Sequence, residues 1–263
     1  MLLELAGVDK IFGGLHAVRG VSLTVRKGEI FGLIGPNGAG KTTLFNVTTG
    51  VYRPDGGKVS FKGVDISGWS PARVAAAGVA RTFQNIRLFR SMTAEQNVMV
   101  AGHQLHRASL LSAILRNQSH ADDESRLRRR ARELLTALGL EQHADDVASS
   151  LPYGSQRRLE IARALMLSPE LLLLDEPAAG LNSREARALE KQIRWLRDEL
   201  GVTIVLVEHN MSVVMSVCER VHVVDHGETI ADGSPAEIKS NPKVLAAYLG
   251  QEVDRREPAG EAE

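Results

Sequence analysis

The chain has 263 residues, and its 32 lysines and arginines are balanced by 32 aspartates and glutamates, so the formal net charge is zero. This balance argues against nucleic acid or an anionic membrane as a partner bound through bulk charge. Hydrophobic residues make up 43% and charged residues 24% of the chain, which is typical of a globular protein and excludes disordered, collagen-like and disulfide-framework classes. Cys218 is the only cysteine, so no intramolecular disulfide can form.

No segment approaches the roughly 18 to 20 uninterrupted apolar residues that a membrane-spanning helix needs. The best candidate, residues 165–174, is interrupted by Ser168, Pro169 and Glu170. The N-terminus shows no basic start, apolar stretch or cleavage site of a secretion signal. We therefore expect the protein to stay in the cytosol.

The first third of the chain reads as strands separated by turn signals. Residues 2–8, 21–25, 30–34 and 58–62 are rich in apolar and β-branched residues, with glycine-containing turns between them. These segments are predicted to be short antiparallel strands.

A phosphate-binding loop follows the strand at residues 30–34. The pattern G-x-x-x-x-G-K-[ST] is matched there by Gly35, Pro36, Asn37, Gly38, Ala39, Gly40, Lys41 and Thr42. Glycines let backbone N–H groups converge on phosphate oxygens, and the helix predicted at residues 43–48 adds the positive end of its dipole. Lys41 is expected to reach the outer phosphates, and Thr42 to offer its hydroxyl to Mg²⁺. A purely structural turn would not need lysine followed by threonine, so the segment predicts a nucleotide site.

A helical block is predicted from about residue 93 to residue 148. Its apolar residues recur at helical spacing, at Leu127, Ala131, Leu134, Leu135 and Leu138. A run of arginines falls mostly on the other face, at Arg126, Arg128, Arg129, Arg130 and Arg132. We interpret this run as a solvated helix face rather than a nucleic-acid site, because nearby carboxylates offset it, at Asp122, Asp123, Glu124 and Glu133.

After the helical block, the sequence pattern predicts strands that alternate with helices. Residues 171–174 and 203–207 are apolar strands around a helix at 183–200, and another strand follows at 221–224. This alternation predicts parallel strands with crossover helices.

Two adjacent carboxylates end the strand at residues 171–174. Successive side chains at a strand end point to different sides. Asp175 is thus placed to hold Mg²⁺ through its water shell, and Glu176 to polarise the water that attacks a γ-phosphate. A solvated strand end would be the simpler interpretation of this pair alone, but a phosphate loop in the same chain favours the catalytic one.

Just ahead of that strand, residues 151–158 read Leu-Pro-Tyr-Gly-Ser-Gln-Arg-Arg. With the two motifs above, this segment makes the chain resemble the ATP-binding subunit of an ABC transporter, whose signature is usually Leu-Ser-Gly-Gly-Gln. Similar pieces follow in order from Phe12 to His209. The resemblance implies an α/β P-loop NTPase fold with a mostly parallel central sheet, an N-terminal antiparallel β-subdomain and an inserted helical subdomain.

The same resemblance implies a division of the chain. Residues 1–250 would form one ABC ATPase domain, with a core at 1–86 and 160–250 and a helical subdomain at 87–159. The tail at 251–263 mixes charge, proline and glycine without periodicity, and is predicted to be disordered.

Further positions take roles from the family. Phe12 resembles the aromatic residue that stacks on adenine, although alone it would read as a core or hairpin aromatic. Gln84 resembles the Q-loop glutamine, which touches Mg²⁺ and water and links the site to the membrane partner. Asn182 lies in a segment similar to the D-loop, which meets the opposite subunit. His209 resembles the switch histidine, which contacts the γ-phosphate. A single histidine at a strand end would be a weak signal without the other motifs.

The resemblance thus implies ATP and Mg²⁺ as cofactors. The implied catalytic residues are Lys41, Gln84, Glu176 and His209. The implied metal-binding residues are Thr42, Gln84 and Asp175. Nucleotide binding would involve the phosphate loop together with Phe12 and Thr43.

The signature departs from the family pattern. Pro152 replaces the serine, Tyr153 the first glycine and Ser155 the glutamine. The segment that acts on the opposite subunit's nucleotide is expected to be Tyr153, Gly154, Ser155 and Gln156. We expect the backbone at Gly154 and Ser155, at the start of a helix, to donate N–H groups to the phosphate in place of the missing serine. The Ser155 hydroxyl is expected to be a further donor.

A narrower resemblance is to the branched-chain amino acid subfamily of these ATPases. It is carried by residues 12–14, 153–163, 175–182, 208–211 and 241–250. The elongated helical block, near 103–130, is similar to that of the longer of the subfamily's two ATPase subunits.

The family works as an assembly. Two ATPase subunits, identical or different, close head to tail on two ATP molecules, and the closure drives two membrane permease subunits. A periplasmic or extracellular substrate-binding protein takes part indirectly, and no nucleic acid is expected. The chain would lie on the inner face of the cell membrane, coupled through a groove near Gln84 and residues 85–99. That segment contains Leu88, Phe89 and Met92, which is more apolar than expected for a solvent-exposed loop. These side chains are expected either to contact the partner or to pack within the helical block.

Two other functions remain open at this stage. Cytosolic ABC ATPases that act on DNA ends or ribosomes usually carry two modules or long insertions, whereas this chain has a single module and neutral charge. A lipopolysaccharide-export ATPase would resemble this subfamily closely. The motifs specify neither the cargo nor the direction of transport.

Overall fold

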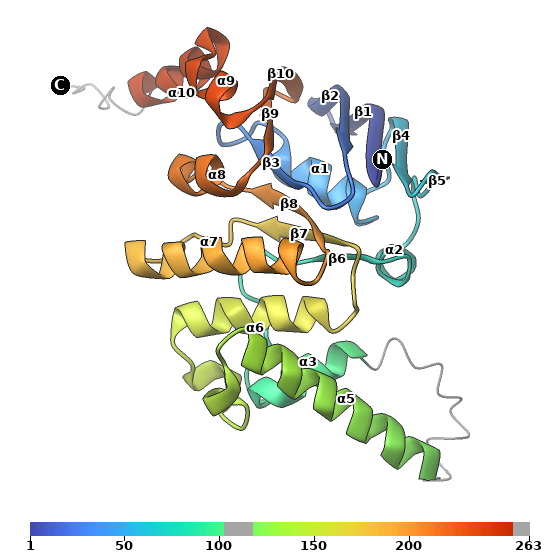
Figure 1. The fold of residues 1–263 in the computed structure, drawn as a ribbon. Coiled ribbons are helices and arrows are strands. Elements are labelled where there is room, and N and C mark those ends of the chain that lie inside the picture. Colours follow the sequence, from blue (N-terminus) through green and yellow to red (C-terminus); the bar gives the residue numbers. More distant parts are fainter. Residues whose placement is uncertain (103–117, 255–263) are drawn as a thin grey trace, which may run out of the picture.

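The chain folds into two β-sheets with helices between and around them (Figure 1). The computed structural model describes residues 1–102 and 118–254, and residues 103–117 and 255–263 lie outside the described part. Within the described ranges, none of the helices has the length and hydrophobicity that a bilayer crossing requires.

The smaller sheet comes from the N-terminal part of the chain and is antiparallel. Its strand order is β2-β1-β4-β5. The strands are β1 (Leu3–Phe12), β2 (Leu15–Val25), β4 (Gly56–Phe61) and β5 (Val64–Asp65). Buried and exposed residues alternate at the start of β1, so one sheet face packs on the core. The antiparallel prediction is confirmed for residues 2–8, 21–25 and 58–62.

The larger sheet has the order β10-β9-β3-β8-β7-β6. Its strands are β3 (Ile30–Ile34), β6 (Val79–Arg81), β7 (Leu171–Asp175), β8 (Thr203–Val207), β9 (Arg220–Asp225) and β10 (Glu228–Gly233). All neighbours pair in parallel except β10, which runs antiparallel to β9. The predicted parallel strands in the second half of the chain are therefore confirmed.

The prediction that residues 30–34 form an antiparallel strand is wrong. This segment is β3, which lies in the middle of the larger sheet and pairs in parallel with β8 and β9. Every residue of β3 is buried. A strand covered on both faces reads as a continuous apolar run, which marks a central parallel strand rather than a hairpin strand.

The helices cover both faces of the larger sheet. Helix α1 (Lys41–Thr48) packs between the two sheets, where Leu44 and Phe45 join the apolar core of the N-terminal strands. The opposite face packs against α6 (Tyr153–Leu165), α7 (Ser183–Asp198) and α8 (Met211–Val217). Three further helices complete this part, α2 (Pro71–Ala76), α9 (Pro235–Ser240) and α10 (Pro242–Asp254).

The helical block lies beside α6, away from the two sheets (Figure 1). It contains α3 (Ala94–Gly102), α5 (Gln118–Ala137) and the short 3₁₀ helices η1 (Glu141–His143) and η2 (Ala148–Ser150). The apolar residues predicted for its inner face are all buried, namely Leu127, Ala131, Leu134, Leu135 and Leu138. Residues 103–117 of the predicted elongated block lie outside the described part.

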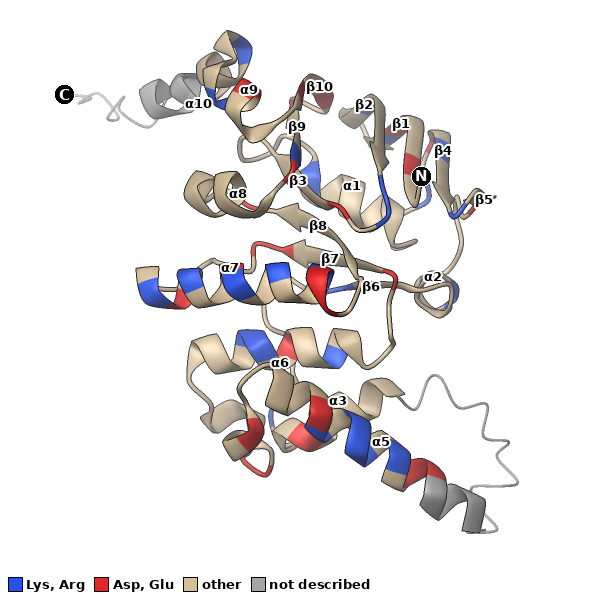
Figure 2. Cartoon of the chain, in the orientation of Figure 1, with Lys and Arg blue, Asp and Glu red and all other residues tan. Residues whose placement is uncertain are grey.

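The arginines of the run on α5 are solvent-exposed. Figure 2 shows acidic residues beside them on α5 and on the neighbouring α3. Arg128 and Arg132 both pair with the buried carboxylate of Glu95 on α3. Arg130 pairs with Glu133 at 3.4 Å. Arg126 also pairs with Asp123, so four of the five arginines have carboxylate partners within the block. This agrees with the interpretation of the run as a helix face.

Two predicted boundaries fall inside helices. Helix α10 continues through Asp254, and so extends into the segment at 251–263 that was predicted to be disordered. Adding residues to an existing helix avoids the cost of nucleation, which favours this extension. The predicted boundary between residues 159 and 160 falls inside α6, because the signature segment and the residues after it form one helix.

Candidate active site

The phosphate loop connects β3 to α1 in a turn that only glycine permits at two positions. A Cβ at Gly35 would lie 2.0 Å from the carbonyl oxygen of Val224. Gly40 has a φ of 102°, and a Cβ there would lie 2.6 Å from the carbonyl oxygen of Ala17. Gly40 also precedes α1 without a side-chain cap, so the first N–H groups of this helix point toward the loop without an intrahelical acceptor. The loop therefore has the geometry of an anion site.

Lys41 begins α1 with its ammonium inside the loop. Its Nζ donates to the carbonyl oxygens of Gly35 and Pro36, at 2.7 Å each. Burial lowers the pKa of Lys41, although Glu176 and Asp175 counteract this effect by their negative charge. The carboxylates thus favour the charged form of the one cation that the loop brings to a phosphate.

A cleft of about 400 Å³ opens beside the loop. Its wall contains Phe12, Gln84 and Glu176, together with the loop residues Asn37, Gly38, Ala39, Gly40, Lys41, Thr42 and Thr43. Phe12 ends β1 with an exposed ring, packed edge-on against Tyr52 at 5.1 Å between centroids. The structure thus brings the predicted adenine-stacking residue and the phosphate loop to one cleft. The wall also contains His16, Arg19 and His226, which no motif indicated.

Asp175 ends β7 beside the loop and is 2% exposed. Its Oδ2 accepts a hydrogen bond from Arg81 Nη2 at 3.1 Å. Its Oδ1 is buried, and no other group in the described part of the chain bonds to it. Burial raises the pKa of Asp175, against the opposing effect of the Arg81 guanidinium. A buried carboxylate oxygen without a partner fits a hydrated Mg²⁺, which takes oxygen ligands and keeps several waters.

Arg81 has a structural role that the motifs do not reveal. Besides Asp175, its guanidinium donates to Asn46 Oδ1 on α1 at 2.7 Å. It therefore ties the carboxyl end of β7 to the helix that follows the phosphate loop. Its only signal in the sequence is its place in the strand that precedes Gln84.

Three predicted catalytic residues meet at one oxygen. Gln84 Nε2 donates to Glu176 Oε2 at 3.0 Å, and His209 Nδ1 lies 3.6 Å from the same oxygen. Glu176 has a φ of 47°, in the left-handed region that a glutamate adopts only at a cost on the order of 1 kcal/mol. Its N–H donates to the carbonyl of Val207 on β8 at 2.8 Å, which holds this conformation. The strained turn places the carboxylate in the cleft wall beside the phosphate loop.

Glu208 is a second buried carboxylate that sequence reasoning missed. It accepts hydrogen bonds from the N–H groups of Ala178, His209 and Asn210. Burial raises the pKa of Glu208, and the bond from the Ala178 N–H is the largest of the opposing effects. This carboxylate thus joins the segment after Glu176 to the start of the His209 segment.

The signature residues lie elsewhere. Pro152 precedes α6, and Tyr153, Gly154, Ser155 and Gln156 form its first turn. Pro152, Gly154 and Ser155 border a separate cleft between α6 and α7, whose lining shares no residue with the phosphate-loop cleft. Within this chain the structure therefore does not bring the signature to the phosphate loop.

The polar groups of this turn are partly used inside the chain. The Ser155 hydroxyl is buried and accepts from Arg158 Nη2 at 3.0 Å, and its N–H donates to the Pro152 carbonyl. Gln156 Nε2 donates to the Leu151 carbonyl at 2.8 Å. Gly154 is only partly buried, which leaves its backbone as the more accessible donor. This conformation does not present the Ser155 hydroxyl, which was expected to donate to a neighbouring subunit.

Asn182, the predicted D-loop residue, caps α7. Its side chain accepts from the N–H groups of Arg184 and Glu185, at 2.9 and 3.0 Å, and Glu185 in turn accepts from the Asn182 N–H. This reciprocal capping box orders the D-loop at the start of α7.

Family models match two parts of the chain. The model described as "ABC transporter" matches residues 18–179, and that described as "Branched-chain amino acid ATP-binding cassette transporter" matches residues 228–254. Among curated proteins, the "High-affinity branched-chain amino acid transport ATP-binding protein LivG" of Salmonella typhimurium is 47% identical over 250 residues, which cover 95% of this chain and 98% of the relative. The "Lipopolysaccharide export system ATP-binding protein LptB" of Escherichia coli is 36% identical over the same shares of the two chains.

Solved structures share the fold. A crystal structure of the ADP conformation of an ATP-binding cassette of an ABC transporter has a TM-score of 0.82 to this chain and 31% sequence identity. The match covers 95% of this chain and 98% of that one. The topology described above is thus that of an ATP-binding cassette.

Proposed function

The chain belongs to the ABC transporter family, and we propose that it is the ATP-hydrolysing subunit of an importer for branched-chain amino acids or related amides. The observation that carries the cargo class is the match to the branched-chain amino acid model at residues 228–254, together with 47% identity to a relative named for that transport. The lipopolysaccharide-export relative is more distant, at 36% identity. The names of these relatives state transport or export, which favours a transporter subunit over a cytosolic ATPase of the same family.

In the proposed reaction the chain's own residues bind ATP and activate water. Phe12 stacks on the adenine, and the N–H groups of the phosphate loop and the Lys41 ammonium bind the phosphates. Thr42, Gln84 and Asp175 would hold Mg²⁺, which neutralises charge on the phosphates. Glu176 accepts a proton from the attacking water, while Gln84 and His209 orient its carboxylate.

Replacing Lys41 with alanine is expected to weaken ATP binding about 10- to 100-fold, because it removes a charge-assisted hydrogen bond to the phosphates. Titration with a fluorescent ATP analogue measures the change. Lys191→Ala on the exposed side of α7 is the matched control and should bind like the parent. Unchanged affinity of the Lys41→Ala variant would show that the loop does not hold phosphates as proposed.

A second ATPase subunit completes the site. The signature turn and the phosphate loop border different clefts in one chain, which supports their meeting across a head-to-tail dimer. We infer that the dimer is formed with a second copy or with a different ATPase subunit. In the proposed division, the core at 1–86 and 160–250 binds ATP and the helical subdomain at 87–159 presents the signature to the partner.

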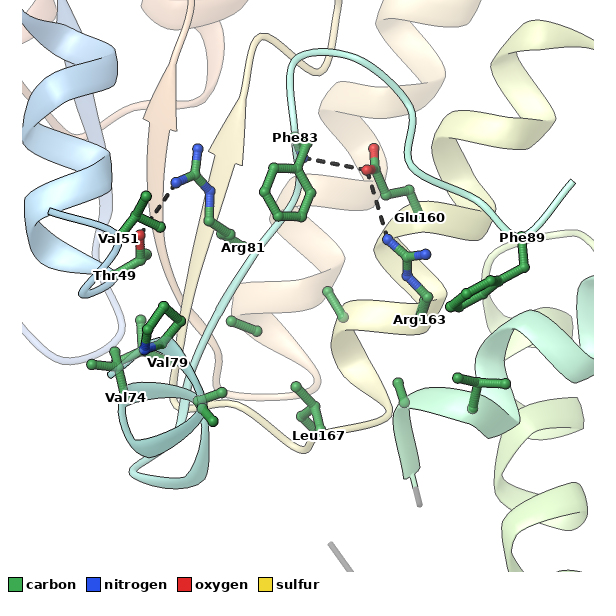
Figure 3. A pocket seen from close by; sticks show the side chains of 17 residues that line it. Thr49, Val51, Val74, Val79, Arg81, Phe83, Phe89, Glu160, Arg163 and Leu167 are labelled. Carbon is green, nitrogen blue, oxygen red and sulfur yellow. Dashed lines mark hydrogen bonds and ion pairs between the residues drawn. The ribbon is translucent and has the colours of Figure 1, made fainter. Parts of the chain in front are cut away.

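The membrane subunits are proposed to dock in a groove beside Gln84. This groove, about 430 Å³, is lined by residues of α2, β6, α3 and α6 (Figure 3). Its walls are largely apolar, and Arg81, Glu160 and Arg163 lie within them. Phe89 borders it with 47% of its surface exposed, whereas Leu88 packs on the core. An apolar groove joined to the Q-loop through Phe83 supports contact with a permease and a peripheral position on the inner membrane face.

Uptake in the source organism tests the proposed function. Cells without this gene should lose uptake of radiolabelled leucine, isoleucine and valine, and the parent gene should restore it. A gene with Glu176→Gln should not restore uptake, because transport needs hydrolysis. Normal amino acid uptake together with lipopolysaccharide retained at the inner membrane would instead identify an export ATPase. A substrate-binding protein encoded nearby would support import.

A further inference from the structure

Arg157 of α6 reaches into the Q-loop from the signature helix. Its guanidinium donates to the carbonyl oxygens of Phe83 and Gln84, at 2.9 and 2.6 Å. It is 5% exposed, so these bonds form away from bulk water. Glu160, one turn further on the same helix face, accepts from the N–H groups of Phe83 and Arg87, at 3.3 and 3.4 Å. One face of α6 therefore holds both the carbonyls and the N–H groups of the Q-loop backbone.

Tyr153 extends these contacts to the D-loop. Its hydroxyl accepts from Arg157 Nη2 at 2.9 Å and from Nε at 3.2 Å. Its ring lies beside Gly180, where an added Cβ would come within 3.2 Å of the tyrosine Cε1. The general family signature has a glycine at the position of Tyr153, and a glycine has no side chain that could orient Arg157 or touch the D-loop. Tyr153 is thus part of a contact inside the chain.

The Q-loop held in this way carries Gln84, whose side chain donates to Glu176 at 3.0 Å. We propose that Arg157 and Tyr153 form a clasp that holds the Q-loop backbone and thereby positions Gln84 against Glu176. Arg157 is a positioning residue, since it acts through Gln84. This assignment rests on the proposed roles of Gln84 and Glu176.

The chemistry of the clasp requires an arginine. A planar guanidinium can donate to two carbonyls and a hydroxyl at once, whereas a lysine ammonium is a compact charge on a flexible stem. Arg157→Lys keeps the charge and loses the fixed fork. Tyr153→Phe keeps the ring against Gly180 and removes only the acceptor for Arg157. The two variants therefore weaken the clasp by different degrees without adding bulk.

A double-mutant cycle tests whether Arg157 acts through Gln84. Arg157→Lys should lower kcat about tenfold with KM nearly unchanged, and Tyr153→Phe should have a smaller effect of the same kind. In a Gln84→Ala background the Arg157→Lys change should cause little further loss, because the amide it positions is gone. An equal loss of kcat in both backgrounds would overturn the proposal, as would a parent-like kcat for Arg157→Lys.

Hydrogen exchange gives a readout that does not depend on turnover. Arg157→Lys should speed amide exchange in residues 83–87 and leave the phosphate-loop peptide at 35–41 unchanged. The control is Arg194→Lys on α7, whose guanidinium donates to the Ser216 carbonyl away from the site, and it should change neither kcat nor exchange. Unchanged exchange in residues 83–87 would overturn the clasp. Absence of ATPase activity in the assembled transporter with the parent chain would instead refute the proposed function.

Discussion

Replacing Glu176 with glutamine is expected to lower kcat for ATP hydrolysis on the order of 10³-fold while ATP affinity stays close to that of the parent. The amide has the size and shape of the carboxylate but accepts no proton from water at neutral pH. The left-handed backbone at this position, with φ of 47°, is equally strained for glutamine, so stability should change little. The loss should therefore appear in the chemical step.

Steady-state ATPase assays and nucleotide titration measure the two quantities separately. Glu199→Gln at the exposed end of α7 removes the same charge away from the site, and should behave like the parent. Because ATP binds without being hydrolysed, Glu176→Gln should also accumulate a closed dimer with ATP, visible by light scattering. Hydrolysis at close to the parent rate would show that Glu176 does not activate the water.

Motifs that lie within one continuous segment were the easiest features to predict from the sequence. The phosphate loop was located correctly between a buried strand and a helix because its requirements are local: glycines where a Cβ would strike Val224 or Ala17, and a lysine at the helix start. The parallel strands of the second half were predicted because apolar runs alternate with amphipathic segments. The same reasoning failed for β3, whose neighbours β8 and β9 come from the other end of the chain.

Contacts between residues that lie far apart in the sequence could not be predicted from sequence patterns. Arg81 in β6, Arg157 in α6 and Glu208 in the segment after β8 each join two parts of the site, yet no motif gave any of them a role. Ser155 shows the opposite case. Its place in the signature suggested a hydroxyl that donates to the partner subunit, whereas in the structure this hydroxyl accepts a hydrogen bond from Arg158 of the same chain. Such partners follow from the packing of α6, which a single sequence does not specify.

The signature turn allows a second decisive test. Gly154→Asp is expected to abolish ATPase activity in the assembled transporter, because it places a carboxylate where the partner's γ-phosphate is proposed to bind. A like-charge contact in a partly dry interface costs several kcal/mol, roughly 10²-fold or more in rate. Pro152→Ser should change activity little, since Pro152 has neither a hydroxyl nor an N–H group and contributes only the shape of the turn.

A contact within the chain must be separated from this effect. A Cβ at Gly154 would lie 3.0 Å from Glu185 Oε1, so an aspartate there also faces the capping carboxylate of α7. Gly154→Asn has the same size without the charge and is the matched control: it should retain part of the activity if charge against the phosphate dominates.

Complementation then shows on which nucleotide Gly154 acts. Where two copies of this chain form the dimer, one Gly154→Asp chain can pair with one Glu176→Gln chain. One site then combines the intact phosphate loop and Glu176 of the first chain with the intact signature of the second. The other site carries both defects. Mixing two inactive variants should therefore restore part of the activity if the signature acts on the partner's nucleotide. If Gly154→Asp retained full activity by itself, residues 151–156 would not contact nucleotide, and the signature assignment would be wrong.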